Sequence, residues 1–247
     1  MDFRNYQTSL LNIKILFRLL LGFWIITISR QEAHSETGLG NWNALILKSK
    51  FSEKWSMIQE SHFKSADFNL QYDYYEIKET VYYAIRSNFA TALGTGLFHT
   101  CDSGTLFEPK EARNELRTWE ELNFKHSLNR LNFEHRSRLE QRFLSSGYQN
   151  RFRYRIGFMV NLNQDPKKQS RFFLSFNNEL YIPLDGIKIE KNRLFTGAGL
   201  QINHNATLTF GRLSDTIYNP AGNSRKSYLY MAVVYNLSRT HAHNTVD

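Results

Sequence analysis

Residues 151–162 alternate strictly between two kinds of side chain. The odd positions begin with three arginines, whereas the even positions are all apolar: Phe152, Tyr154, Ile156, Phe158, Val160 and Leu162. Successive side chains of a β-strand point to opposite faces of the sheet. The pattern therefore predicts a strand over Gln149–Asn163 with one apolar face and one strongly cationic face.

A second charged face precedes this strand. Arg136, Arg138, Glu140 and Arg142 share one parity, and only residues 144–148 separate their run from the next one. A wall of charges is rarely buried in the core of a soluble protein. We therefore expect these side chains to line the lumen of an outer-membrane β-barrel.

The chain from residue 41 onward divides into eleven such runs, separated by turn residues. Runs of roughly 10–15 residues are long enough for a tilted strand to cross a bilayer, whereas strands of soluble proteins average about five or six residues. The expected strands are Asn41–Phe51, Lys54–Ala66, Leu70–Arg86, Asn88–Thr100, Leu116–Leu128, Arg130–Leu144, Gln149–Asn163, Ser170–Pro183, Asn192–Asn203, Ala206–Ile217 and Lys226–Leu237. The fold class predicted is all-β, an antiparallel up-and-down transmembrane β-barrel. In the last run both faces are apolar, so its orientation is not predicted.

An odd number of runs conflicts with the even strand number of bacterial outer-membrane barrels. If Leu70–Arg86 contains two strands, the barrel has twelve, which we favour. If Asn41–Phe51 lies outside the wall, it has ten. Cys101–Glu115 is expected to be a long loop, because it contains Gly104 and Pro109.

Residues 110–144 also admit a helical interpretation. Their Glu, Arg and Leu content favours helix, and Leu128, Leu131, His135 and Leu139 have helical spacing. A helical hairpin would leave the arginine face of Gln149–Asn163 unpaired, so we favour strands.

The amino terminus has the layout of a secretory signal peptide. Arg4, Lys14 and Arg18 precede an apolar run over residues 19–28, and Ala33 and Ser35 are small residues before a cleavage point. The run is shorter than the about 20 apolar residues that a spanning helix needs. We expect a signal peptide over residues 1–35, a barrel over 36–237 and a polar tail over 238–247, with the mature protein in the bacterial outer membrane.

Composition narrows the function. The net charge is +8, and removing residues 1–35 takes away four basic and two acidic residues, which leaves +6. Because the arginines alternate with apolar residues, they suit a wall better than a nucleic-acid patch, and no nucleic acid is expected. Cys101 is the only cysteine, so neither a disulfide nor a metal site with cysteine spacing is expected, and no cofactor is implied. A mean hydropathy of −0.49 excludes a polytopic helical protein.

The candidate site is a network of charges in the lumen. Its expected members are Glu60, Glu121, Arg136, Arg138, Glu140, Arg142, Arg151, Arg153, Arg155, Glu179 and Arg193. These residues could form an anion-attracting constriction for a small anionic solute, since arginine binds carboxylate and phosphate in a bidentate manner. Alternatively, arginine–glutamate pairs fill a narrow lumen, which we favour because an unpaired buried charge is costly. The other expected partner is membrane lipid.

Two other functions stay open. One is a secreted, lipocalin-like barrel that binds a ligand. The other is an outer-membrane lipid hydrolase, although adjacent strand residues such as His126 and Ser127 point to opposite faces and cannot act as base and nucleophile. We predict no catalytic residues.

The order of features resembles an uncharacterised "domain of unknown function" family of small outer-membrane β-barrels from Gram-negative bacteria. The resemblance covers nearly all of Asn41–Leu237 and is most specific over Arg138–Arg142, with weaker matches at Lys54-Trp55, Arg117–Leu122 and Asn150–Arg155. It implies a barrel and an outer-membrane location, and no established activity. The polar tail after Leu237 departs from the terminal aromatic residue that many outer-membrane proteins carry.

Overall fold

The computed structural model describes residues 34–68, 72–104, 109–162, 171–186 and 188–237. These residues form eleven strands: β1 (His34–Lys50), β2 (Trp55–Ser65), β3 (Tyr74–Arg86), β4 (Phe89–Gly104), β5 (Pro109–Leu128), β6 (Leu131–Leu144), β7 (Gly147–Asn161), β8 (Phe172–Pro183), β9 (Lys191–Gln201), β10 (Ala206–Ile217) and β11 (Ser224–Leu237). None of the described residues forms a helix that is long and apolar enough to span a membrane. Of the signal peptide expected over residues 1–35, residues 1–33 lie outside the described residues, as does the tail over 238–247, whereas His34 and Ser35 belong to β1.

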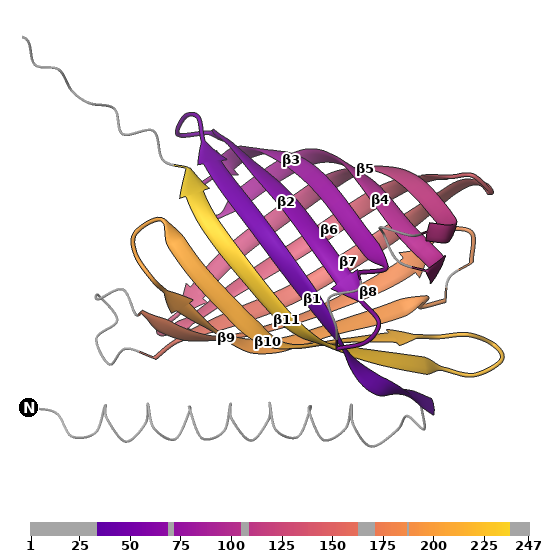
Figure 1. Cartoon of the computed structure of the whole chain (residues 1–247). Coiled ribbons are helices and arrows are strands. Elements are labelled where there is room, and N and C mark those ends of the chain that lie inside the picture. Colours follow the sequence, from indigo (N-terminus) through magenta and orange to yellow (C-terminus); the bar gives the residue numbers. More distant parts are fainter. Residues whose placement is uncertain (1–33, 69–71, 105–108, 163–170, 187, 238–247) are drawn as a thin grey trace, which may run out of the picture.

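The eleven strands close into one barrel in chain order. Each strand pairs antiparallel with the next, and the ring closes where β1 pairs parallel with β11, from Leu39 with Ser227 to Ser49 with Leu237. Figure 1 shows these two strands side by side along the seam. The prediction of an all-β barrel is confirmed, whereas the expected antiparallel pairing throughout is wrong at this seam. The expected strand numbers of twelve and ten are wrong, because a parallel seam lets an odd number of strands close.

Two sequence expectations fail locally. Leu70–Arg86 contains one strand, β3, which begins at Tyr74. The expected loop Cys101–Glu115 is largely strand, since β4 reaches Gly104 and β5 begins at Pro109. There Cys101 pairs with Ala112, so cross-strand pairing overrides the local turn signals of Gly104 and Pro109. The helical alternative for residues 110–144 is also wrong, because β5 and β6 pair continuously from Glu115–Leu144 to Leu128–Leu131.

The two ends of the barrel differ in which chain terminus they carry. We call the end where β1 begins the amino-terminal rim, and the end where β11 finishes the carboxyl-terminal rim (Figure 1). The turns from β1 to β2, β3 to β4, β5 to β6 and β9 to β10 lie at the carboxyl-terminal rim. An odd strand number places the two termini at opposite rims.

The outer face of the barrel is apolar and the inner face is charged. Leu93 and Leu97 on β4 point outward with 67% and 60% of their surface exposed, whereas the inward-facing Glu140 on β6 is 0% exposed. Folded proteins in water normally show the reverse, with charge outside and apolar side chains inside. The alternation of side chains along each strand thus separates an apolar outer face from a charged inner face.

One part of the inner face is apolar. Trp42 on β1, Phe195 on β9, Leu213 on β10 and Tyr228 on β11 form a buried cluster, with Tyr230 packed against it. This apolar wall explains why both faces of Lys226–Leu237 are apolar in the sequence. The ring of Phe195 lies so close to β9 and β10 that a Cβ at Gly197 or Gly211 would meet it at 2.6 or 2.9 Å.

Candidate functional site

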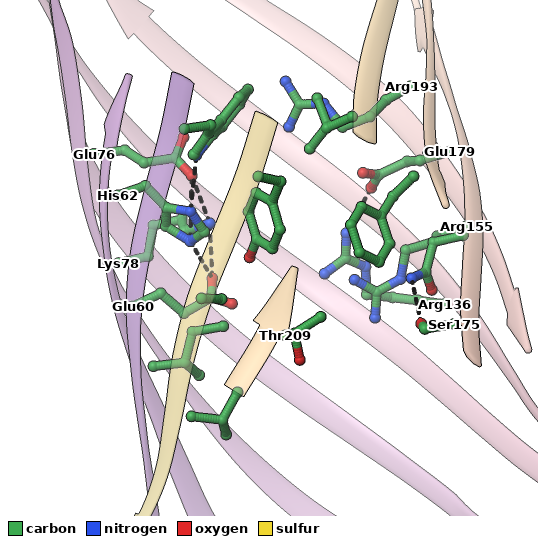
Figure 2. Close-up of a pocket in the computed structure, with 18 of the residues that line it drawn as sticks. Glu60, His62, Glu76, Lys78, Arg136, Arg155, Ser175, Glu179, Arg193 and Thr209 are labelled. Carbon is green, nitrogen blue, oxygen red and sulfur yellow. Dashed lines mark hydrogen bonds and ion pairs between the residues drawn. The ribbon is translucent and has the colours of Figure 1, made fainter. Parts of the chain in front are cut away.

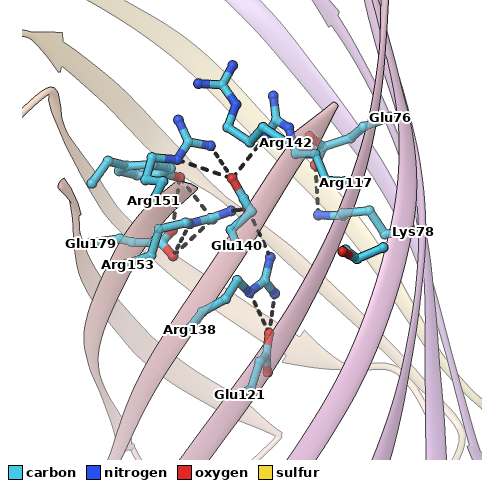
Figure 3. Close-up of polar contacts among 12 residues, drawn as sticks. Glu76, Lys78, Arg117, Glu121, Arg138, Glu140, Arg142, Arg151, Arg153 and Glu179 are labelled. Carbon is cyan, nitrogen blue, oxygen red and sulfur yellow. Dashed lines mark hydrogen bonds and ion pairs between the residues drawn. The ribbon is translucent and has the colours of Figure 1, made fainter. Parts of the chain in front are cut away.

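The lumen is crossed by a layer of shared ion pairs centred on Glu140. Its carboxylate accepts hydrogen bonds from Arg151 and from Arg153, whose Nη1 lies 2.6 Å from Oε2 (Figure 3). Arg117 and Arg138 approach the same carboxylate at 3.8 Å. Four guanidinium groups therefore surround one fully buried carboxylate.

Two further carboxylates extend this layer around the wall. Glu121 on β5 accepts a hydrogen bond from Arg138 Nε at 2.6 Å, and Arg136 lies 3.9 Å away. Glu179 on β8 binds Arg136, and also Arg153 at 2.9 Å. Because several arginines touch two carboxylates each, the layer is one network rather than a set of separate pairs.

The network also contacts aromatic rings. The guanidinium of Arg138 lies 4.4 Å from the Trp119 ring, and that of Arg193 lies 4.5 Å from the Trp42 ring. Trp119 in turn covers Gly94 on β4, where a Cβ would meet its ring at 2.2 Å. Such contacts bury the guanidinium faces that hydrogen bonds leave free.

A smaller cluster lies on β2 and β3. Lys78 Nζ binds Glu60 and Glu76 at 2.7 Å each. His62 stands between these two carboxylates, with Nε2 at 4.0 Å from Glu60 and 3.7 Å from Glu76. Its Nδ1 accepts a hydrogen bond from Trp42 Nε1 at 3.1 Å.

All eleven sequence-predicted site residues lie on the inner face of the barrel, and the structure brings seven of them into the central network: Glu121, Arg136, Arg138, Glu140, Arg151, Arg153 and Glu179. The other four pair with residues that the sequence reasoning missed. Glu60 binds Lys78, Arg142 binds Glu115, Arg155 binds Glu134 and Arg193 binds Asp215.

The strand register identifies two of these missed partners. Asp215 directly opposes Arg193 in the β9–β10 register, and Lys78 directly opposes Glu60 in the β2–β3 register. Once the strand register is known, each of these side chains is assigned to the inner face. The sequence alone did not provide the register, because most runs have more than one plausible end.

Many charges of the interior pair with one another. Ion pairs between described interior residues join nine acidic side chains to eleven basic ones, an excess of two positive charges. The acids are Glu60, Glu76, Glu115, Glu121, Glu134, Glu140, Glu179, Glu190 and Asp215, and the bases are Lys78, Arg117, Lys125, Arg136, Arg138, Arg142, Arg151, Arg153, Arg155, Lys191 and Arg193. The positive charges of these side chains are therefore compensated by carboxylates on the same inner face.

A cavity of about 230 Å³ lies between the charged and apolar walls (Figure 2). Trp42, Phe195 and Arg193 line it toward the amino-terminal rim, and Ile46 and Val234 toward the other rim. The exposed fraction of the ion-paired side chains rises from 10% at Arg136 to 27% at Arg155 and 36% at Glu134. The ion-paired side chains on β6 and β7 thus become more exposed toward the carboxyl-terminal rim.

A second cavity of about 200 Å³ lies at the amino-terminal rim, between Arg142, Arg151, Asp185 and Glu190. Arg151 reaches Glu190 at 3.2 Å, so its guanidinium joins this rim to the central network. The central layer separates the two cavities.

Serine and histidine side chains of the kind that a hydrolase would need have other contacts. Ser127 Oγ donates to Asn132 Oδ1 at 2.7 Å, while the His126 ring stacks on Phe133. Ser214 Oγ lies 3.0 Å from Ser227 Oγ. Within the ranges that the structure describes, no group of three or more His, Cys, Asp or Glu side chains is arranged to hold a metal ion.

Comparison with known proteins identifies the family to which the chain belongs. No curated protein matches the chain. The family model described as "Protein of unknown function (DUF2490)" matches residues 39–226, which run from β1 into β11. The resemblance to a domain of unknown function is thus confirmed, and the chain belongs to the DUF2490 family.

Proposed function

We propose that this barrel spans a bacterial outer membrane with its lumen closed, and that it acts as a structural or solute-binding barrel rather than an open pore. The observation that carries the proposal is the polarity of the wall. Large apolar side chains point outward and are exposed, while ion-paired charges are buried inside. In the hydrocarbon core of a bilayer this arrangement is the stable one, since lipid replaces water at the outer face.

Backbone hydrogen bonding supports the same proposal. Every strand pairs with two neighbours around the closed ring. A closed barrel leaves no strand edge unpaired, and closed barrels are one of the two structures that can cross a bilayer. In water, by contrast, contiguous exposed apolar patches rarely exceed a few hundred Å².

Aromatic side chains on the outer face mark a level near the carboxyl-terminal rim. Trp55 and Tyr83 lie 4.9 Å apart between ring centroids, and His126 stacks on Phe133 at 4.8 Å. Outer-membrane barrels carry aromatic girdles at the membrane–water interface. We assign this level to one interface.

The closed lumen is tested by electrical recording. The full chain, refolded and inserted into planar bilayers, is expected to give no steady conductance above that of bilayers treated with detergent alone. Heat-modifiable migration on gels verifies in parallel that the barrel is folded. Stable anion-selective steps would reject the closed lumen and favour the anion channel, while leaving membrane insertion standing.

A soluble, ligand-binding barrel is the second candidate, and the 230 Å³ cavity favours it. Cell fractionation separates the two. Recovery in the outer-membrane pellet after a urea wash supports the membrane barrel. Recovery in the soluble periplasm without detergent would reject it.

A further inference from the structure

The cavity between the two inner walls has an unusual mixture of surfaces. One side is apolar and is lined by Trp42, Phe195, Leu213 and Tyr230. The facing side carries Arg136 and Arg155, together with Glu179 and Asn177 (Figure 2). Binding sites for small molecules combine an apolar surface with a few converging polar groups in this way.

His62 lines this cavity between Glu60 and Glu76, on the side opposite Arg136 and Arg155 (Figure 2). The indole N–H of Trp42 can only donate, so Nδ1 of His62 must act as the acceptor of that hydrogen bond. In the neutral ring the proton then sits on Nε2. This Nε2 is buried and has no hydrogen-bond partner among the described residues.

Two arginines present similar unused groups. The Nε atoms of Arg136 and Arg155 are buried without a hydrogen-bond partner in the described part of the chain, and both side chains line the cavity. The buried side-chain atoms that lack a partner on this lining are therefore all nitrogen donors. A buried donor without an acceptor is costly, so a ligand that supplies acceptor oxygens would be stabilised here.

The net charge of the interior side chains indicates the charge of the ligand. Because the ion-paired interior carries an excess of two positive charges, an anionic ligand is favoured there over a neutral or a cationic one. We infer that this cavity binds a small amphipathic monocarboxylate, with its carboxylate toward the register partners Arg136 and Arg155 and its apolar body against Trp42 and Phe195.

Titration calorimetry on the full chain refolded in detergent micelles tests the inference. The probe is benzoate, with benzyl alcohol as its uncharged counterpart and acetate as the carboxylate without an apolar body. Protein-free micelles give the background heat. We expect saturable binding of benzoate, with benzyl alcohol and acetate each at least tenfold weaker, because each lacks one of the two recognition elements.

A first variant pair tests the location. Thr209 lines the cavity, whereas the adjacent Leu208 points to the outer face. Thr209→Phe fills the cavity and is expected to abolish benzoate binding. Leu208→Phe adds a ring on the opposite face and is expected to bind as the wild type does.

A second pair tests the charge. Arg155→Met keeps the apolar stem, removes the donors and is expected to weaken benzoate binding at least tenfold, since hydrogen bonds between charged groups are stronger than those between neutral ones. Glu134→Gln removes the same ion pair, in which Arg155 Nη2 lies 2.6 Å from Glu134, but keeps the guanidinium, so binding should be retained.

The inference is overturned if folded protein shows no saturable benzoate binding, if benzyl alcohol binds equally well, or if Thr209→Phe binds benzoate like the wild type. The measurement is made in micelles, so it does not depend on insertion into a membrane. Failure of the outer-membrane proposal and failure of this inference are therefore distinguishable.

Discussion

Buried charges in this protein are stabilised by being shared. Glu140 has no exposed surface and lies within 4.0 Å of four arginines, while Arg153 contacts both Glu140 and Glu179. Replacing one partner of a buried pair leaves the others uncompensated, which costs more than the pair itself contributes. A residue at such a shared position is therefore expected to matter more for stability than a residue in a single ion pair.

Glu140→Gln tests this expectation. The substitution keeps the shape of the side chain and removes the charge that Arg151 and Arg153 share, so we expect the free energy of unfolding to fall by about 3–5 kcal/mol. The denaturation midpoint in urea, measured on the refolded barrel in detergent, reports the change. Glu53→Gln is the matched control, because Glu53 is exposed in the β1–β2 turn and pairs only with Lys50 among the described residues. Equal midpoints for the two variants would show that the network does not stabilise the fold.

At the level of the strand, the alternation of side chains determines which face of the sheet each one occupies. The register with the adjacent strand then determines which side chain lies beside it. Most strands pair with their neighbours in the sequence, so their pairing follows from short turns. The β1–β11 seam is different, because it joins the two ends of the barrel and runs parallel. A parallel seam is what allows eleven strands to close.

A disulfide tests the seam. Leu45 and Val233 are register partners on the outer face of β1 and β11. In a Cys101→Ser background, Leu45→Cys with Val233→Cys is expected to form a disulfide under mild oxidation, since paired strand residues lie within disulfide reach. Non-reducing gels detect it as a change in mobility.

The control moves one cysteine along the strand. Leu229 also faces outward on β11 and lies four residues from Val233, or about 13 Å at the rise of a strand. Leu45→Cys with Leu229→Cys should stay unlinked. Linking of this pair in place of the first would mean that the seam has a different register.

Considered as a whole, the molecule is inverted relative to a soluble barrel. Its charges meet one another in the interior, and its large apolar side chains form the outer surface. The same fold thus combines a polar core, held by ion pairs, with an exterior suited to lipid. The two inner walls differ as well, and the cavity exists where the charged wall faces the apolar one.

Leu97→Arg tests the environment of the outer face. Leu97 points outward from β4, so in a bilayer a charge there is expected to reduce stability by about 2–4 kcal/mol if the residue lies near the midplane. At a site this exposed in water the same change would have little effect. Folding into liposomes, followed by heat-modifiable migration, measures the loss. Phe51→Arg in the exposed β1–β2 turn serves as the control and should fold normally, and equal folding of both variants would argue against lipid at Leu97.

The sequence predicted the strands well where alternation is strong, as in β7, and poorly where local turn signals compete with pairing, as at Gly104 and Pro109. Among the site residues, the inward-facing arginines were readable from parity alone. Lys78 and Asp215 were missed, because assigning them requires the register of a neighbouring strand.

By itself the sequence determined the all-β class, the approximate strand positions and the charged inner face, because these follow from the local period of two. Only the tertiary structure decided that eleven strands close through a parallel seam, which carboxylate each arginine meets, and where a cavity is left. These features depend on contacts between residues far apart in the chain, and closure of the barrel, not local sequence, brings those residues together.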